Sequence, residues 1–382
     1  MRSTRNLKSL VTLACCHLFI FYGPIDSQAK SEKADEKYRI LVVDSYHGEY
    51  LWSQETGKGF ASALLEQGFL DSKTQLEAFL KSDQVESQKA TIKRVWMDTK
   101  RNSQPPQISS ATKKVIDVID AFKPQLVFLG DDNAANFIGN HYIDQGFPMV
   151  FWGVNGTPLK YNLLDSEEKP GHNITGVYQA GYFKESLAML LELYPEAKNF
   201  AIIADDTATG RSKAKTIEAL AKRGELPLSL NKTILTNDFD TWKSEIKAAE
   251  PEVDAFFVLN YQGLKDKNGQ PLPTMEAPAW YLKNINKPEV SDEKQFVETG
   301  MLLSVDDSGY NQGYVATKMG LEFLLGRKSP ATTAPLAPAP GPRVLNANRA
   351  NQLKTPIAKT KVDEKITYSL GLGQRKPASG GR

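Results

Sequence analysis

Pairs of acidic side chains follow three apolar segments that are predicted to be β-strands. The pairs are Asp131-Asp132 after residues 126–129, Asp205-Asp206 after 200–204, and Asp306-Asp307 after 301–305. A single carboxylate, Asp44, ends a fourth such segment. One Asp at a strand-to-helix turn can cap the helix by accepting hydrogen bonds from its first N–H groups. A cap needs only one carboxylate, so the recurrent pairs predict a second role, binding the ammonium or hydroxyl groups of a ligand.

The stretch 124–158 shows how such side chains are positioned. It contains an apolar strand at 126–129, a helix at 134–143 and a second apolar strand at 148–152. Two apolar strands joined by a helix predict a βαβ unit in a parallel sheet that is buried on both faces. Ligands of such sheets bind at the carboxyl ends of the strands. Here those ends carry Asp131, Asp132, Asn133 and Asn155.

The same alternation continues along the chain. Further strands are predicted at 37–43, 91–97, 200–204, 229–235, 253–259 and 300–305, and further helices at 56–68, 109–122, 184–194, 209–223, 239–249 and 314–325. A loop at 156–171 separates two runs of alternating strands and helices, and five prolines mark an extended connector at 329–342. Two successive runs predict an α/β protein with two lobes.

Residues 1–29 form a predicted signal peptide, in which a basic start precedes an apolar core at 10–22. Ser27 and Ala29 mark a cleavage site, so the mature chain is expected to start at Lys30 and to be secreted to the periplasm.

Cys15 and Cys16 lie inside this signal, and Leu13 precedes Cys16 at the spacing of a lipoprotein signal. Lipid anchoring is therefore the alternative to cleavage at Ala29. After cleavage at Ala29 the mature chain has no cysteine, which excludes disulfides and thiol chemistry.

Charge and motifs exclude several classes of function. The chain has 47 Lys and Arg against 45 Asp and Glu, and basic residues are concentrated after Arg327, which leaves the rest of the mature chain acidic. We therefore predict no nucleic-acid partner. The sequence lacks the G-x-S-x-G, Walker A, H-E-x-x-H and EF-hand patterns, so we predict no cofactor and no metal site.

Several segments carry a family resemblance. They are VVDSYHGEYLWS (42–53), WMDTKR (96–101), FKPQLVFLGDDNAANFIGN (122–140), FPMVFWGVNGTP (147–158), NITGVY (173–178), ADDTATGR (204–211), VDAFFV (253–258) and SGYNQGYVATKMGLEFLLG (308–326). In this order they resemble the ABC-transporter substrate-binding proteins, whose members include tryptophan- and tyrosine-binding lipoproteins. The resemblance extends from about Tyr38 to Ile357.

The resemblance implies the type I periplasmic binding-protein fold, in which two Rossmann-like lobes with parallel sheets surround a ligand cleft. The chain would cross between the lobes near Thr157, near 288–293 and near Arg327. Lobe 1 would be residues 38–157 plus 293–326, and lobe 2 residues 158–291 plus 328–362. Independently of the resemblance, the Gly, Ser, Lys and Arg content of residues 366–382 predicts a disordered basic tail.

Polar and aromatic side chains at the predicted strand ends are the candidate ligand-binding residues. They are Ser45, Tyr46, Trp52, Asp131, Asp132, Asn133, Asn155, Tyr178, Gln179, Asp206, Thr209, Asn260 and Asp307. Of the two adjacent aspartates, Asp132 is favoured over Asp131, which follows Gly130 directly and is better placed to finish the strand.

The expected function is that of a monomeric receptor. It would bind a small polar organic ligand, with an amino-acid-like molecule favoured, and deliver it to an ABC permease in the inner membrane. Two alternatives remain open at this point: a sensory protein that feeds a membrane kinase, and a metal-assisted enzyme that uses the acidic pairs.

The signal peptide gives a first testable prediction. Because Ser27-Gln28-Ala29 fits signal peptidase better than Cys15 or Cys16 fits a lipoprotein signal, the mature protein should begin at Lys30. Mass spectrometry of the exported protein measures this directly. An acylated Cys15 or Cys16 would contradict the prediction.

Overall fold

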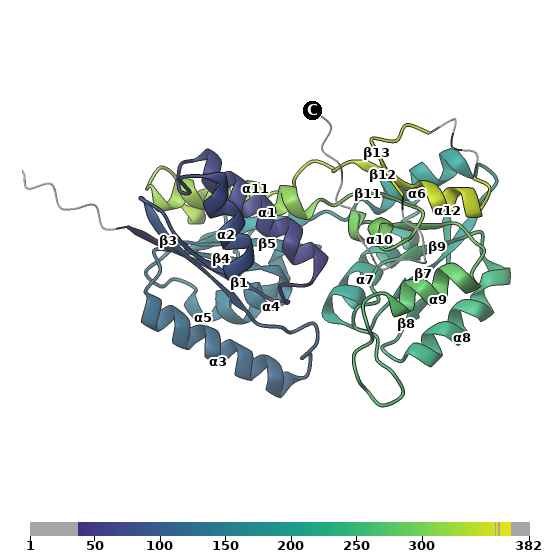
Figure 1. The fold of residues 1–382 in the computed structure, drawn as a ribbon, viewed down its shortest axis with the longest axis horizontal. Coiled ribbons are helices and arrows are strands. Elements are labelled where there is room, and N and C mark those ends of the chain that lie inside the picture. The colour runs from purple at the N-terminus through teal and green to yellow at the C-terminus, as the bar shows by residue number, and fades with distance from the viewer. Residues whose placement is uncertain (1–36, 356, 358–359, 368–382) are drawn as a thin grey trace, which may run out of the picture. The chain divides into compact units, whose positions relative to one another are not determined.

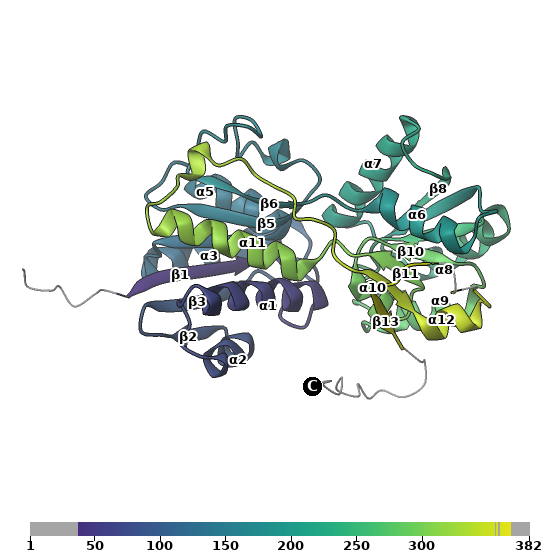
Figure 2. The ribbon, with the colours of Figure 1, turned by 90° about the horizontal axis from the view of Figure 1, so that it is seen from above.

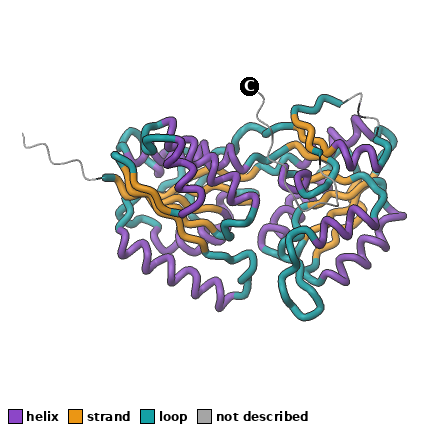
Figure 3. Tube along the Cα trace, viewed as in Figure 1, coloured by secondary structure: helices purple, strands orange, loops and turns teal. Residues whose placement is uncertain are grey.

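The computed structural model describes residues 37–355, 357 and 360–367. The predicted signal peptide lies outside the described residues, as does the predicted tail beyond residue 367. Two sheets organise the described chain, and helices flank both faces of each sheet (Figures 1 and 3).

The first sheet has the strand order β2-β3-β1-β4-β5-β6, and every pair is parallel except β2–β3. Its strands are β1 (Tyr38–Asp44), β2 (Gln84–Glu86), β3 (Ala90–Trp96), β4 (Leu126–Gly130), β5 (Met149–Asn155) and β6 (Ile174–Gln179). Its flanking helices are α1 (Leu51–Glu66), α2 (Lys73–Ser82), α3 (Pro105–Phe122) and α11 (Gly309–Leu324).

Alternating apolar residues of β1 face two separate cores. Ile40 and Val42 pack with residues of α1 and α11, whereas Leu41 and Val43 pack with residues of α3. Helices α1 and α11 lie side by side (Figures 1 and 2). Gly59 permits this close approach, since a Cβ there would lie 2.0 Å from the Tyr310 carbonyl oxygen.

The second sheet has the order β13-β12-β11-β10-β9-β7-β8, in which only β11–β12 is antiparallel. Its strands are β7 (Asn199–Ala204), β8 (Ser229–Leu235), β9 (Ala255–Val258), β10 (Glu289–Ser291), β11 (Leu303–Val305), β12 (Arg343–Asn346) and β13 (Glu364–Ile366). Its helices are α6 (Phe183–Leu193), α7 (Ala208–Lys222), α8 (Phe239–Ala249), α9 (Glu276–Asn284), α10 (Lys294–Glu298) and α12 (Ala347–Gln352). We call the two sheets with their helices lobe 1 and lobe 2.

The chain crosses between the lobes three times, as predicted, but the crossings lie at different residues from those predicted from the sequence. Strand β6 pairs with β5 in lobe 1, so the chain leaves that lobe after Gln179 and not near Thr157. Strand β11 belongs to lobe 2, so the second crossing follows Val305 and not residues 288–293.

The proline-rich connector forms the third crossing. Leu336 exchanges backbone hydrogen bonds with Gly176 and Tyr178 along the edge of β6, at 3.1 and 3.0 Å. The chain then reaches β12 in lobe 2 at Arg343, well beyond the crossing expected near Arg327. Proline suits this edge position because it does not have to donate to a ladder of hydrogen bonds.

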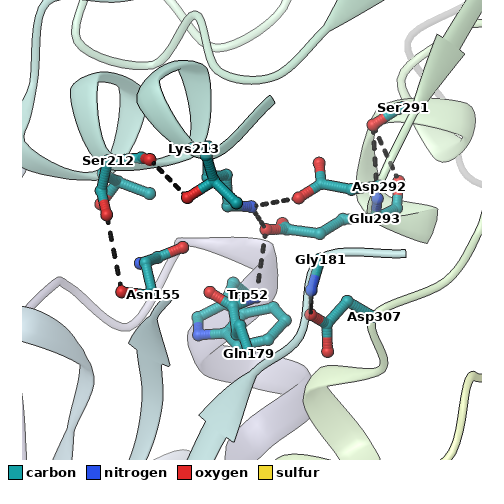
Figure 4. Close-up of polar contacts among 12 residues, drawn as sticks. Trp52, Asn155, Gln179, Gly181, Ser212, Lys213, Ser291, Asp292, Glu293 and Asp307 are labelled. Atoms are coloured by element: carbon teal, nitrogen blue, oxygen red, sulfur yellow. Dashed lines mark hydrogen bonds and ion pairs between the residues drawn. The ribbon is translucent and has the colours of Figure 1, made fainter. Parts of the chain in front are cut away.

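The acidic pair Asp306-Asp307 ties the three crossings together. Asp307 Oδ2 accepts a hydrogen bond from the Gly181 N–H of the first crossing at 2.8 Å (Figure 4). The Asp306 carbonyl accepts from the Gly341 N–H of the third crossing at 2.8 Å. Asp307, a predicted ligand-binding residue, therefore lies in the hinge, where its carboxylate joins two connecting segments.

Burial raises the pKa of both hinge carboxyls. The pKa of Asp307 rises to about 7, although the Gly181 N–H opposes the shift. The pKa of Asp306 rises to about 8, although its hydrogen bond from the Lys294 N–H opposes the shift. Both groups therefore bind a proton more tightly in the folded protein than in an unfolded chain, where the pKa of Asp is about 3.9.

This gives a prediction about pH. A carboxyl with a raised pKa contributes most to stability below its unfolded value and loses that contribution as the pH rises through its folded value. The melting temperature should therefore fall from about pH 5 to about pH 9. Asp307→Asn should flatten the fall, because the neutral amide still accepts from Gly181. Thermal melts across this range test it, with the exposed Asp206→Asn as control, and identical slopes for Asp307→Asn and wild type would contradict it.

Candidate ligand-binding site

Buried polar residues of the two lobes meet at the carboxyl ends of their strands (Figure 4). Among the described residues, hydrogen bonds that cross the interface include Tyr46 Oη to Thr209 Oγ1 at 2.8 Å, Ser212 Oγ to the Asn155 carbonyl at 3.5 Å, Gln179 Nε2 to Glu293 Oε1 at 3.4 Å, and Gln295 Nε2 to Tyr50 Oη at 3.4 Å. This interlobe site contains predicted residues from both halves of the chain, as expected for parallel sheets whose strand ends face one another.

Asp131 is the most unusual residue of the site. It is 1% exposed and adopts a left-handed backbone conformation with φ of 68°, which costs a non-glycine residue free energy. Its Oδ1 accepts a hydrogen bond from Trp52 Nε1 at 2.7 Å, whereas Oδ2 is buried without a partner. Burial, with Asp44 and Asp132 nearby, raises the pKa of Asp131 well above its usual value.

The helix that follows Asp131 is irregular. It begins as α4 (Asp131–Asn133), continues as the π-helical turn η1 (Ala134–Gly139) and ends as α5 (Asn140–Tyr142). Wide π turns inside helices occur often at functional sites. The unpartnered carboxylate oxygen and the two backbone irregularities thus lie at one strand end, which makes it the candidate functional position.

Asp132 has its partners within lobe 1. It accepts hydrogen bonds from Tyr161 at 2.9 Å and from Asn155 Nδ2 at 2.6 Å, and it pairs with Lys160 Nζ at 2.6 Å. Lys160 and Tyr161 belong to the 3₁₀ turn η2 (Pro158–Tyr161), inside the loop that the sequence left without structure. The sequence favoured Asp132 over Asp131 as ligand partner, but the geometry favours Asp131, because the carboxylate of Asp132 is already satisfied.

Ser45 and Asn133 support the strand ends. Ser45 Oγ donates to the Gly130 carbonyl at 2.6 Å and accepts from the Ala134 N–H at 2.8 Å. Asn133 Nδ2 donates to Thr99 Oγ1 at 2.8 Å. The capping role that the sequence allowed for Asp131 and Asp132 therefore falls to Ser45, whose hydroxyl has no capacity left to donate to a ligand.

Aromatic side chains line the lobe 1 side of the site. Tyr46, Tyr50 and Trp52 form a buried cluster, in which the first two rings meet edge to face with centroids 5.1 Å apart. Lys100 Nζ lies 4.8 Å from the Tyr46 ring centroid. With the Asn260 amide oriented so that its oxygen faces lobe 1, Lys100 donates to it at 3.2 Å.

Lys100 was not among the site residues predicted from the sequence. The only local indication in the sequence was its position two residues after Asp98. That segment follows β3, at the same edge of the sheet as the carboxyl ends of the other strands.

The remaining predicted ligand-binding residues differ in how close they lie to the interlobe site. Asp206 is exposed and pairs with Arg211 at 2.7 Å, so the structure places it outside the interlobe site. Its neighbour Asp205 is buried and accepts from the Gly263 N–H at 2.7 Å. Tyr178 is half-buried beside the third crossing and contributes its backbone to β6.

A second missed feature is the buried ion cluster on the lobe 2 side. Lys213 Nζ lies 2.7 Å from Asp292 Oδ2 and also pairs with Glu293 (Figure 4). Burial lowers the pKa of Lys213, but the two carboxylates outweigh that effect and raise it above its usual value. Lys213 therefore stays charged and holds Glu293 toward Gln179 of lobe 1.

Within the described residues, no group of three or more His, Cys, Asp or Glu side chains is arranged to hold a metal ion. None of the described helices is both long and apolar enough to cross a membrane.

Comparisons with known proteins agree with this geometry. A family profile described as ABC transporter substrate binding protein matches residues 91–360. No curated protein matches the chain.

Three similar solved structures each cover 87% of this chain, and each is covered over its whole length. They are an ABC domain from Streptococcus pneumonia in complex with L-Trp (TM-score 0.65, 18% identity), a conserved domain protein from Vibrio cholerae (0.64, 16%), and a ligand-free, open substrate binding protein with adhesive properties from Clostridium difficile (0.62, 16%). At these identities the similarity concerns the fold. It confirms the two-lobe type I periplasmic binding-protein fold that the sequence predicted.

The Asp132 network leads to a prediction. Asp132→Asn should lower the melting temperature of the ligand-free protein, because it leaves Lys160 and Tyr161 facing a neutral amide. Loss of a charged hydrogen-bond partner at a partly buried site costs about 1–3 kcal/mol. Denaturant unfolding measures the difference. Asp131→Asn is the matched comparison, and it should not destabilise the ligand-free protein, because it removes a buried carboxylate that has no cationic partner. Equal losses in the two variants would contradict the assignment.

Proposed function

The chain belongs to the ABC transporter substrate binding protein family, and from this premise we propose that it captures a small amino-acid-like molecule between its lobes and delivers it to an ABC permease. The family and the fold are those of substrate-binding, non-catalytic proteins. Proteins of this family act outside the cytoplasm, which agrees with the predicted signal peptide and a periplasmic location.

The observation that carries the proposal is the unpartnered carboxylate oxygen of Asp131, buried at a strand end in the interlobe site. Leaving a buried carboxylate oxygen without a donor is costly, so the site is built for a ligand that brings one. An ammonium group suits it best, because a charged donor forms the stronger hydrogen bond with a carboxylate.

The surrounding aromatic residues support an amino-acid-like ligand. Tyr46, Tyr50 and Trp52 supply apolar surface and ring faces, against which the organic part of such a molecule can pack. One structural neighbour was solved in complex with L-Trp, which is consistent with this class of ligand. The three chain crossings supply the hinge by which the lobes would close on it.

Delivery to a permease requires only that a monomer with closed lobes present a defined surface to the membrane protein. We propose that the receptor is monomeric, since one chain contains both halves of the site.

The proposal predicts ligand-dependent stabilisation without turnover. In a thermal-shift screen of amino acids, sugars and nucleosides, an amino-acid-like compound should raise the melting temperature and be recovered unchanged. Asp131→Asn should weaken its binding at least tenfold, which corresponds to about 1.4 kcal/mol. Titration calorimetry measures this, with Asp206→Asn, an exposed carboxylate outside the site, as the matched control.

Three outcomes would count against the proposal. They are chemical conversion of the bound compound, full-strength binding by Asp131→Asn, and loss of binding in the Asp206→Asn control to the same degree as in Asp131→Asn. Delivery itself is tested by uptake of the identified compound in cells that carry or lack the receptor gene.

A further inference from the structure

Three lysines at the interlobe site differ in burial and in how their charge is compensated: Lys160 is half-buried, whereas Lys213 and Lys100 are buried. Lys160 pairs with Asp132 at 2.6 Å, and Lys213 pairs with Asp292 at 2.7 Å. Lys100 is the third, and it is only 5% exposed. Ion pairs have an N–O distance of at most 4.0 Å. Among the described residues, no carboxylate oxygen lies that close to Lys100 Nζ.

The contacts that Lys100 does make are neutral. Its Nζ lies 4.8 and 5.4 Å from the ring centroids of Tyr46 and Tyr50, and it donates to the Asn260 amide oxygen of lobe 2 at 3.2 Å. Burial lowers the pKa of Lys100, and Asp205, Glu293 and Asp131 oppose this effect from beyond ion-pair distance.

These contacts do not account for a lysine at this position. Burying a cation costs several kcal/mol even after the protein relaxes, and ring faces and one amide oxygen return only part of it. A neutral donor would make the same hydrogen bond to Asn260 without the cost of desolvating a charge. The free-energy cost of burying the lysine charge is offset only if an anion occupies the site together with the lysine.

We propose that Lys100 binds the carboxylate of the ligand, so that the solute is a zwitterion whose carboxylate pairs with Lys100 while its ammonium pairs with Asp131. Both charges lie on lobe 1, and each lacks an ion-pair partner among the described residues. The inference rests on the proposed receptor function and narrows its ligand class. Sugars, nucleosides and polyamines lack one or both of these charges and are excluded.

Matched ligands and matched variants test the proposal. Wild type, Lys100→Met and Lys58→Met are screened by thermal shift against the L-amino acids and, for each, its carboxamide. Lys58 is the control because its side chain is exposed on α1 and pairs there with Glu55. We expect an L-amino acid to stabilise wild type and Lys58→Met, its carboxamide to be at least tenfold weaker, and Lys100→Met to bind the amino acid at least tenfold more weakly.

The ligand-free proteins provide a second, independent measurement. If Lys100 is an uncompensated buried charge, Lys100→Met should melt at the same or a higher temperature than wild type without any ligand, since an apolar side chain of similar size replaces a buried ion. A lower melting temperature would show that Lys100 serves as a structural link to Asn260, and would overturn the inference.

The remaining outcomes separate this inference from the proposed function. Equal binding of an amino acid and its carboxamide, or tight binding of a sugar, nucleoside or polyamine, would overturn the role of Lys100 and leave the receptor function standing. If no compound binds, the receptor function is contradicted, and the ligand-free melting temperatures still decide whether Lys100 is a structural residue.

Discussion

Charge burial between the lobes is the constraint on which this structure depends. A buried ion needs a partner, and the protein supplies one at most positions: Arg94 for Asp44, Lys160 for Asp132, and Lys213 for Asp292 and Glu293. Among the described residues, Asp205, Asp306 and Asp307 are buried without an ion pair, but each accepts a hydrogen bond from a backbone N–H. Asp131 Oδ2 has no partner and Lys100 has only neutral contacts, so the burial of these two groups is unexplained by the protein alone. We propose that the same rule separates side chains that hold the lobes in shape from those that bind a ligand.

The strand end beside Asp131 and the hinge are joined through Gln312 of α11. Its Oε1 accepts from the Gly153 N–H at 3.0 Å, and its Nε2 donates to the Tyr178 carbonyl at 3.0 Å and to Asp307 at 3.4 Å. Gly153 has φ of 66° and lies against Asp131, since a Cβ on it would come 2.4 Å from Asp131 Oδ1. One buried amide therefore contacts both the strained strand end and the segment that crosses between the lobes.

The sequence predicted the α/β class and most central elements, because strands buried on both faces appear as apolar runs; β8 and α8 match their predicted bounds. It failed where a buried charge interrupts the pattern. Strand β10 contains Glu289, which is fully buried only because Arg349 of α12, 60 residues away, binds it at 2.8 Å. A carboxylate with such a distant partner looks like a loop residue locally. Strand β6 was assigned to lobe 2, because its pairing with β5 lies across a polar loop.

The adjacent residues Asp131 and Asp132 illustrate why the sequence predicted the location of the site but not the role of each side chain in it. Asp131 and Asp132 follow the same apolar run, and the local argument that Asp131 finishes the strand favoured Asp132 as the ligand partner. Their roles diverge because a turn 28 residues downstream places Lys160 against Asp132, whereas Asp131 turns into a left-handed conformation beside Trp52. Lys100 was overlooked for the complementary reason, since a lysine in a polar segment is usually exposed, whereas here it lies against Tyr46, Tyr50 and, in the other lobe, Asn260. The proposed ligand-binding role rests on which polar groups lack a partner, a property that exists only once the chain is folded.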